Sequence, residues 1–298
     1  MRIRPLQRDD RDALLRIWND SATYDRLGAA LLEEKIWADQ DLVPACCLVA
    51  DTDGRTAGFA VGVVRESGTG YVKLLAVDRE LQRQGIGRAL LEALESSLAA
   101  SGATAIRLLE AAPNYLVPGI DVRYEAAIRF AEACHYERTG VATNLRVDLD
   151  DALQRLRDAA TAPGLEVRRA APGDEESVRR FLAANWPGWT AEALSALGNT
   201  PSTLHIAVRD GSVVGFSASD ANNKGTGWFG PMGVAPDVRQ SGIGRVLLGR
   251  CLSDLHRQGH RHATIPWVDP VAFYERCAGA WPARSFLRFE KRVARQVT

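Results

Sequence analysis

Lysine is scarce in this chain: only four of its 37 basic residues are lysines, and the rest are arginines. Because 37 acidic residues balance them, no net positive charge attracts nucleic acid. No apolar run approaches the ~18 residues of a membrane-spanning helix, and no apolar secretion-signal segment follows Met1. We therefore expect a cytoplasmic protein without nucleic-acid or membrane partners.

Cysteine is also sparse, and its spacing argues against a protein held together by disulfides and against a cysteine metal site. The five residues are odd in number and form no Cys-x-x-Cys pair: Cys46, Cys47, Cys134, Cys251 and Cys277. This pattern favours reduced, mostly buried thiols over a disulfide framework, and we expect no metal. The content of 46% apolar and 25% charged residues is that of an ordinary globular protein, long enough for two cores.

One glycine-rich signal is present twice. Residues 82–88 read Gln-Arg-Gln-Gly-Ile-Gly-Arg, and residues 239–245 read Arg-Gln-Ser-Gly-Ile-Gly-Arg, at a spacing of 242 − 85 = 157 residues. The same offset relates Val77 to Val234. A period of this length matches a whole domain, so the chain is predicted to contain two copies of one fold.

The two copies are predicted over residues 1–155 and 165–298, with a linker at Ala162-Pro163-Gly164. Each copy shows the same order of patterns, namely a short strand, helices, three antiparallel strands, a long helix, a strand, a helix and a closing strand. The closing strands are expected at 138–149 and 285–291, each completing its own copy. The fold class is therefore α/β (α+β), with a mixed, mostly antiparallel sheet flanked by helices in each copy.

The repeated loop has the properties of an anion site. A glycine-rich loop that enters a helix directs unpaired backbone N–H groups and the positive end of the helix dipole at one place. A tight turn alone would also require such glycines. A dinucleotide fold is not supported, because neither copy has Gly-x-Gly-x-x-Gly within a βαβ unit, and a triphosphate loop is not supported, because Gly-Lys-Ser/Thr is missing.

With these loops, the chain resembles the GNAT superfamily of acetyl-CoA-dependent N-acetyltransferases, whose motif is Gln/Arg-x-x-Gly-x-Gly/Ala between a strand and a helix. The resemblance covers nearly the whole chain and implies a splayed sheet in each copy. It implies that the diphosphate of coenzyme A lies on one of the two loops and that the acetyl carbonyl is held by a strand amide at Val77 or Val234. The loop residues are Arg83, Gln84, Gly85, Ile86, Gly87 and Arg88 in the first copy and Arg239, Gln240, Ser241, Gly242, Ile243, Gly244 and Arg245 in the second.

The resemblance assigns catalysis to the second copy. GNAT enzymes commonly protonate the leaving thiolate with a tyrosine in the helix after the fifth strand, and Tyr274 has that position, whereas the first copy has Ala131 there. An alkyl ammonium must first lose a proton, so a base is also required. Candidates for the base are Asp269, Asp220, His205 and His262, each of which is also compatible with an ordinary strand-end role.

The first copy keeps its loop but lacks the acid tyrosine, so it either binds coenzyme A without turnover or uses another acid, such as Tyr124 or a water. Its segment 113–124 is longer than the matching join in the second copy, and loops of this kind often line substrate sites. Glu110 is a candidate to accept a cationic amine, and Trp267 of the second copy to stack on a substrate.

The predicted activity is acetyl transfer from acetyl-CoA to a primary amine of a small molecule, by an acyltransferase acting as a monomer or homodimer. Tandem chains of this length resemble mycothiol synthases and glucosamine or glucosaminide N-acetyltransferases, so an amino sugar is one candidate acceptor. The alternatives are a non-catalytic acetyl-CoA-binding or regulatory module and a protein N-acetyltransferase.

Overall fold

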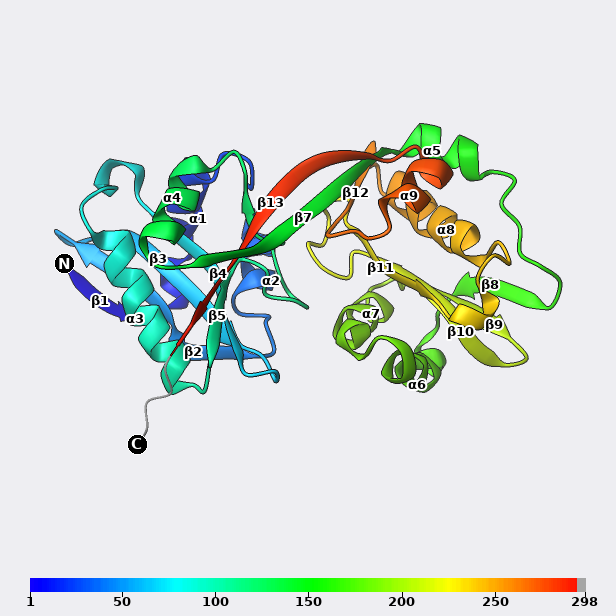
Figure 1. Ribbon diagram of the computed structural model, residues 1–298, viewed down its shortest axis with the longest axis horizontal. Helices are drawn as coiled ribbons and strands as arrows, with labels where there is room; N and C mark the ends of the chain where they lie inside the picture. Colours follow the sequence, from blue (N-terminus) through cyan, green and yellow to red (C-terminus); the bar gives the residue numbers. More distant parts are fainter. Residues whose placement is uncertain (294–298) are drawn as a thin grey trace. The chain divides into compact units, whose positions relative to one another are not determined.

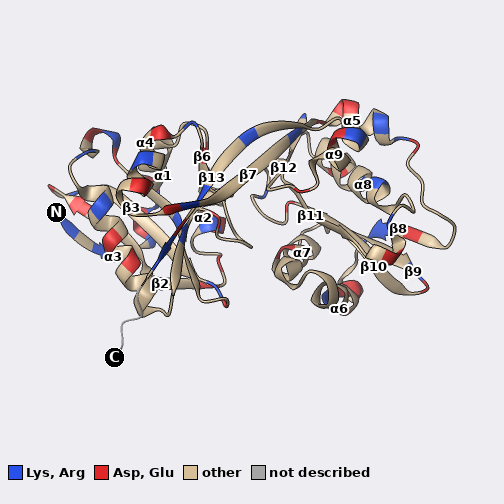
Figure 2. Ribbon diagram, in the orientation of Figure 1, with Lys and Arg blue, Asp and Glu red and all other residues tan. Residues whose placement is uncertain are grey.

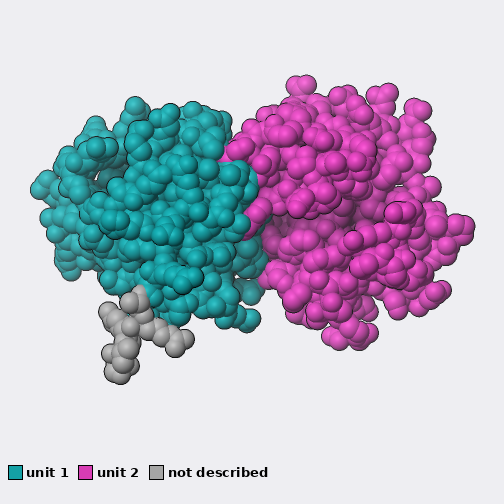
Figure 3. All heavy atoms as spheres, viewed as in Figure 1, with its two compact units in different colours: residues 1–142, 286–298 teal, residues 143–285 magenta. Residues whose placement is uncertain are grey.

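The computed structural model describes residues 1–293, which form two compact units (Figure 1 and Figure 3). Unit 1 consists of residues 1–142 and 286–293, and unit 2 of residues 143–285. Figure 2 shows basic and acidic residues interspersed along both units. Within the described chain, no helix has the length and apolar character needed to cross a membrane, and all five cysteines are free thiols.

Unit 1 is built on a twisted sheet in the order β1-β2-β3-β4-β5-β13, with β6 also paired to β13. All of these neighbours are antiparallel except β4 and β5, which are parallel. Its elements are β1 Arg2–Pro5, α1 Arg11–Ser21, α2 Ala29–Lys35, β2 Leu42–Thr52, β3 Arg55–Val64, β4 Thr69–Val77, α3 Ile86–Ala100, β5 Ala105–Leu108, β6 Ile120–Asp121 and α4 Glu125–Ala133.

Helix α3 covers this sheet because its apolar residues recur at helical spacing. Leu90, Leu94 and Leu98 lie on one face and are fully buried in the core cluster of unit 1. The helix begins directly after Gly85, whose φ of 85° is the left-handed value that glycine adopts without strain. The core thus fixes the direction in which the start of α3 points.

Unit 2 repeats this arrangement around a four-stranded sheet in the order β11-β10-β9-β8, with β12 paired to β7. Helix α8 packs against β10 as α3 packs against β3. Its elements are α5 Leu149–Leu156, β8 Leu165–Arg169, α6 Glu175–Asn185, α7 Thr190–Leu197, β9 Leu204–Arg209, β10 Ser212–Ser219, β11 Phe229–Val234, α8 Ile243–Arg257, β12 His262–Ile265 and α9 Val271–Ala278. Unit 1 therefore has the mixed, mostly antiparallel sheet that the sequence predicts. The paired strands of unit 2 are antiparallel, and one isolated parallel bridge joins Trp228 to Thr264.

The two closing strands are exchanged between the copies, which differs from the predicted ranges 1–155 and 165–298. Strand β7 (Glu137–Asp148) pairs through residues 145–148 with β12 of unit 2, and β13 (Trp281–Arg292) pairs through residues 286–292 with β6 and β5 of unit 1. Phe289 lies in the core of unit 1, and Leu145 lies in a core cluster of unit 2. Both strands have similar alternating patterns, so the sequence does not reveal which sheet each one completes.

Candidate functional site

The sheet of unit 1 opens where β4 and β5 separate. Their parallel pairing ends at Val72 and Leu108, and the Leu109 N–H donates to the Val72 carbonyl at 2.8 Å as the last bond between them. Lys73 is the extra residue of a β-bulge, since Val72 pairs with Gly62 and Leu74 with Val61 of β3. Beyond this bulge, residues 75–77 of β4 border an open space on the side where β5 would continue.

A cavity of about 710 Å³ lies in this space, and it is lined by residues of unit 1. The glycine-rich loop contributes Gln82, Arg83, Gly85, Gly87 and Arg88, and β4 contributes residues 75–77. A volume of this size is typical of small-molecule and cofactor sites. Most of the remaining lining comes from α1, the segment after it, residues 117–121, Tyr124 and α4, whose lining residues run from Ala126 to Ala133.

The loop in unit 1 is open to a ligand. The first bond of α3 runs from the Ala89 N–H to the Gly85 carbonyl at 3.0 Å, so the amides of residues 86–88 have no acceptor within the helix. A Cβ placed on Gly85 would meet nothing within 4 Å. Arg83 and Arg88 are exposed beside these amides. Backbone donors, a helix start and two guanidinium groups together fit a diphosphate.

Val77 faces the same cavity. Its carbonyl accepts hydrogen bonds from Ser21 Oγ at 3.0 Å and from Gln82 Nε2 at 3.1 Å, and all three residues line the cavity. In an extended strand the N–H and C=O of one residue point to the same side. The Val77 N–H is therefore directed into the space that residues 82–88 border. That it holds an acetyl carbonyl, as the family resemblance implies, stays a prediction.

In unit 2 the corresponding loop is covered by the chain itself. The Ala160 carbonyl oxygen lies only 2.1 Å from where a Cβ of Gly242 would stand. The Ala162 N–H donates to the Ser241 carbonyl at 3.0 Å, and Arg245 donates to the Arg155 carbonyl at 3.3 Å. Gly242 has the same φ of 85° as Gly85, so the loop geometry is retained while its access is closed.

Strand β11 of unit 2 is closed from its other side by Trp186. A Cβ on Gly233, next to Val234, would lie 2.5 Å from the indole ring, and this ring also contacts Phe181, Trp189 and Phe216. Trp186 directly follows α6, and the residue that directly follows α1 in unit 1 is Ala22. Ala22 lines the open cavity.

Tyr274, the predicted acid, is 8% exposed in an apolar cluster of unit 2. Its ring packs against Phe229 and Phe273, and burial raises the pKa of its hydroxyl above the ordinary value. A Cβ on Gly244 would lie 3.4 Å from the Phe273 ring, and one on Gly87 would lie 3.7 Å from the Phe130 ring, which supports the pairing of Tyr274 with Ala131. The surroundings of Tyr274 are those of a core aromatic.

The other predicted residues lie apart from the cavity, except for Tyr124. Glu110, predicted to accept an amine, is 1% exposed and accepts hydrogen bonds from Arg288 at 2.6 and 2.9 Å.

The remaining predicted residues belong to the second copy. Asp220 accepts from the Gly225 N–H at 3.0 Å within a turn, and Asp269 is exposed. The backbone N–H of Trp267 donates to Asn144 Oδ1 at 2.9 Å. His205 is buried against Asp254 at 2.8 Å, and His262 lies 3.7 Å from Asp148.

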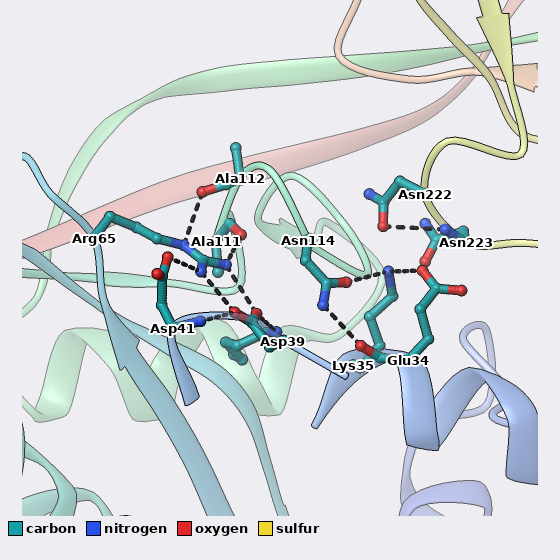
Figure 4. A network of polar contacts seen from close by, with 11 residues as sticks. Glu34, Lys35, Asp39, Asp41, Arg65, Ala111, Ala112, Asn114, Asn222 and Asn223 are labelled. Atoms are coloured by element: carbon teal, nitrogen blue, oxygen red, sulfur yellow. Dashed lines mark hydrogen bonds and ion pairs between the residues drawn. The ribbon is translucent and has the colours of Figure 1, made fainter. Parts of the chain in front are cut away.

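A mostly buried cluster of charged side chains lies next to the end of β5, outside the cavity (Figure 4). Arg65 donates to Asp39 and Asp41 and to the carbonyls of Ala111 and Ala112. Lys73 also contacts Asp39 and is 2% exposed. Burial lowers the pKa of Lys73 to about 8, against the opposing effect of Asp39. This cluster ties the bulge of β4 to the segment that follows β5.

Sequence reasoning missed the residues that decide which copy is open. The signal at Trp186 was available in the sequence. Arg4 pairs with Asp10 in the first copy and Arg168 pairs with Asp174 in the second, so the two copies align at an offset of 164 residues in this region. That offset pairs the large Trp186 with the small Ala22. Within residues 1–293, no group of three or more metal-ligating side chains lies together.

Comparisons with known proteins agree with this architecture. A family model described as acetyltransferase (GNAT) family matches residues 11–136 and 166–280. A mycothiol acetyltransferase of Thermomonospora curvata is 30% identical over 211 residues, which cover 67% of this chain and 66% of that protein. The chain thus spans slightly under two thirds of that relative's length.

Two solved structures share the fold over nearly the whole chain. The glucosamine N-acetyltransferase region of a fungal multi-domain β-N-acetylglucosaminidase has a TM-score of 0.80 at 20% identity, covering 97% of this chain and 38% of that one. A tandem GNAT protein from the clavulanic acid biosynthesis pathway has a TM-score of 0.70 at 18% identity, covering 98% of both chains.

Proposed function

This chain belongs to the acetyltransferase (GNAT) family, and on that premise we propose that it transfers an acetyl group from acetyl-CoA to a primary amine of a small molecule, in the cavity of unit 1. The observation that carries this proposal is the contrast between the two loops. The loop at Gly85 borders an open cavity of about 710 Å³, whereas the loop at Gly242 is covered by the Ala160 carbonyl.

The residues of unit 1 have separate roles in this proposal. The amides of residues 86–88 hold the diphosphate, with Arg83 and Arg88 adding charge. The Val77 N–H holds the acetyl carbonyl and stabilises negative charge on its oxygen. Bound acetyl-CoA supplies the activated acetyl thioester.

The far wall of the cavity receives the amine. Asp25 brings a carboxylate to it, which attracts an ammonium group, and Tyr124 brings a hydroxyl that donates a proton to the leaving sulfur. Tyr124 thereby takes the role that the family resemblance assigned to Tyr274.

Calorimetry with acetyl-CoA and a matched pair of charge reversals tests the choice of unit. Arg88 and Arg245 are equivalent exposed residues of the two loops, so Arg88→Glu and Arg245→Glu disturb the fold equally little. We expect one acetyl-CoA per chain and about tenfold weaker binding in Arg88→Glu, with Arg245→Glu unchanged. The reverse pattern would move the site to unit 2, and no heat in the wild type would reject the proposal.

Three features of unit 2 favour a non-catalytic role for the second copy. Its loop is covered, its cleft is filled by Trp186, and its strand β12 pairs with β7. These contacts favour a structural half that holds the exchanged strand in place.

Amino sugars are the first acceptors to test, because the relatives include a mycothiol acetyltransferase and a glucosamine N-acetyltransferase region. Thiol release from acetyl-CoA in the presence of glucosamine and other primary amines measures the reaction. An acetyl-CoA-binding chain that releases no thiol with any amine would support the non-catalytic alternative.

A further inference from the structure

Two segments of unit 1 that are far apart in sequence are joined at the cavity by three side chains. One segment, residues 22–28, follows α1, and the other, residues 117–124, precedes α4; both contribute to the cavity wall. The joining residues are Tyr24 from the first segment and Arg123 and Tyr124 from the second. We call these three residues the clamp.

The contacts of the clamp are close and of different kinds. The Tyr24 N–H donates to the Tyr124 hydroxyl at 2.7 Å, and the two rings lie 5.2 Å apart between centroids. The Arg123 guanidinium stands over the Tyr24 ring at 3.8 Å from its centroid. Such a cation–π contact is favourable at partly exposed sites.

Both ends of the clamp are anchored. Arg123 donates to both oxygens of Asp121, at 2.8 and 2.7 Å, and Asp121 is 1% exposed on the short strand β6, which pairs with β13. On the other side, Asn19 of α1 exchanges two hydrogen bonds of 2.9 Å with the backbone of Leu27. The indole of Trp18 donates to the Asp25 carbonyl at 2.5 Å.

We infer that the clamp determines acceptor specificity, by restricting the cavity of unit 1 to small-molecule amines and excluding polypeptide amino termini. This inference rests on the proposed function. A polypeptide acceptor must continue out of the site between the two wall segments, and the clamp ties those segments together. A small amine requires no such exit. The Tyr24 side chain is 45% exposed and does not itself line the cavity, so it joins the two segments without being part of the core.

Hydrogen exchange first tests whether the clamp exists in solution. The Tyr24 amide should exchange more slowly in the wild type than in Tyr124→Phe, which removes the accepting oxygen and keeps the ring. Equal exchange in the two proteins would overturn the inference. This readout does not depend on any acceptor or on acetyl-CoA.

Thiol release with ethanolamine, glucosamine and tetra-alanine amide then tests specificity. The wild type should acetylate a small amine and leave the peptide. Tyr24→Ala should raise the ratio of kcat/KM for peptide over small amine on the order of tenfold. Arg123→Lys should raise the same ratio and keeps a positive charge beside the buried Asp121. It is used in place of Arg123→Ala, which would leave that carboxylate buried without its partner and is expected to fold poorly.

Arg138→Ala is the matched control, because Arg138 is an exposed arginine paired with Glu132 outside the cavity. The inference is overturned when the wild type prefers the peptide or when Tyr24→Ala leaves the ratio unchanged. Binding of acetyl-CoA with no amine acetylated would count against the acetyl transfer on which the inference rests. Failure of the wild type to bind acetyl-CoA would instead reject the proposed function itself.

Discussion

The indole ring of Trp186 lies so close to Gly233 that a Cβ on the glycine would stand 2.5 Å from the ring. The glycine is therefore required by the tryptophan, and the two residues together close the cleft of unit 2 beside Val234. At the equivalent place in unit 1, Ala22 leaves the cleft open. Together with the Ala160 carbonyl over Gly242, this pair of residues distinguishes two copies whose loops are almost identical.

A tryptophan placed at position 22 of unit 1 should block the cavity of that unit. We expect Ala22→Trp to weaken acetyl-CoA binding by about tenfold or more, or about 1.4 kcal/mol, because the indole would occupy the space beside β4. Titration calorimetry measures this. The smaller Ala22→Ser serves as the control and should bind as the wild type does, and tight binding by Ala22→Trp would contradict the model of the site.

Alanine at the two helix-opening glycines should have unequal effects on stability. Both glycines have a φ of 85°, so each substitution introduces left-handed strain of about 1 kcal/mol. Gly242→Ala must in addition displace the Ala160 carbonyl, whereas Gly85→Ala meets open space. Urea denaturation should therefore show the larger loss for Gly242→Ala, and equal losses would mean that the linker does not cover the loop.

Removing the hydroxyl of Tyr274 should leave acetyl transfer unchanged. Its ring packs between Phe229 and Phe273 in a core cluster, and phenylalanine keeps that shape. We expect kcat for Tyr274→Phe within twofold of the wild type, while Tyr124→Phe lowers kcat with acetyl-CoA affinity retained. Steady-state kinetics on both variants decides between the units, since a large loss of kcat in Tyr274→Phe alone would return catalysis to unit 2.

Acid should destabilise unit 1 through Asp39. Burial alone would raise the pKa of Asp39, but hydrogen bonds from Arg65 and the charge of Lys73 outweigh it and lower the pKa to about 2. Because this pKa is below that of the unfolded chain, the contribution is fully present above about pH 4 and is lost as the pH falls toward 2. Its size is about 2 kcal/mol.

Denaturation curves of a matched pair of variants from pH 7 to pH 2 measure this contribution. Asp39→Asn should cost about 3 kcal/mol at pH 7, because Lys73 stays buried without its carboxylate, and should flatten the acid slope. Asp41→Asn, which removes a 44% exposed carboxylate from the same Arg65, should cost less than about 1 kcal/mol. An unaltered acid slope in Asp39→Asn would assign the acid lability to other carboxyls.

Much of the fold could be predicted because it depends on local signals. The start of α3 follows from Gly85 and from the leucines that recur at helical spacing, and the antiparallel strands follow from alternating residues with turns at Asp53-Gly54 and Asp210-Gly211. The partner of a strand is not local information. The closing strands β7 and β13 match either sheet by pattern, and only long-range packing of Phe289 and Leu145 assigns them.

The sequence by itself determined the duplication, the fold of each copy and the two glycine-rich loops that open a helix, because glycine conformations and hydrophobic periodicity act within a few residues. The tertiary structure decided which loop is open, since the Ala160 carbonyl and the Trp186 ring reach unit 2's loop and strand from distant parts of the chain. It also decided that Glu110 neutralises Arg288 and that Tyr124 lines the cavity. These outcomes depend on which side chains fill a shared space, and that is fixed only when the chain packs.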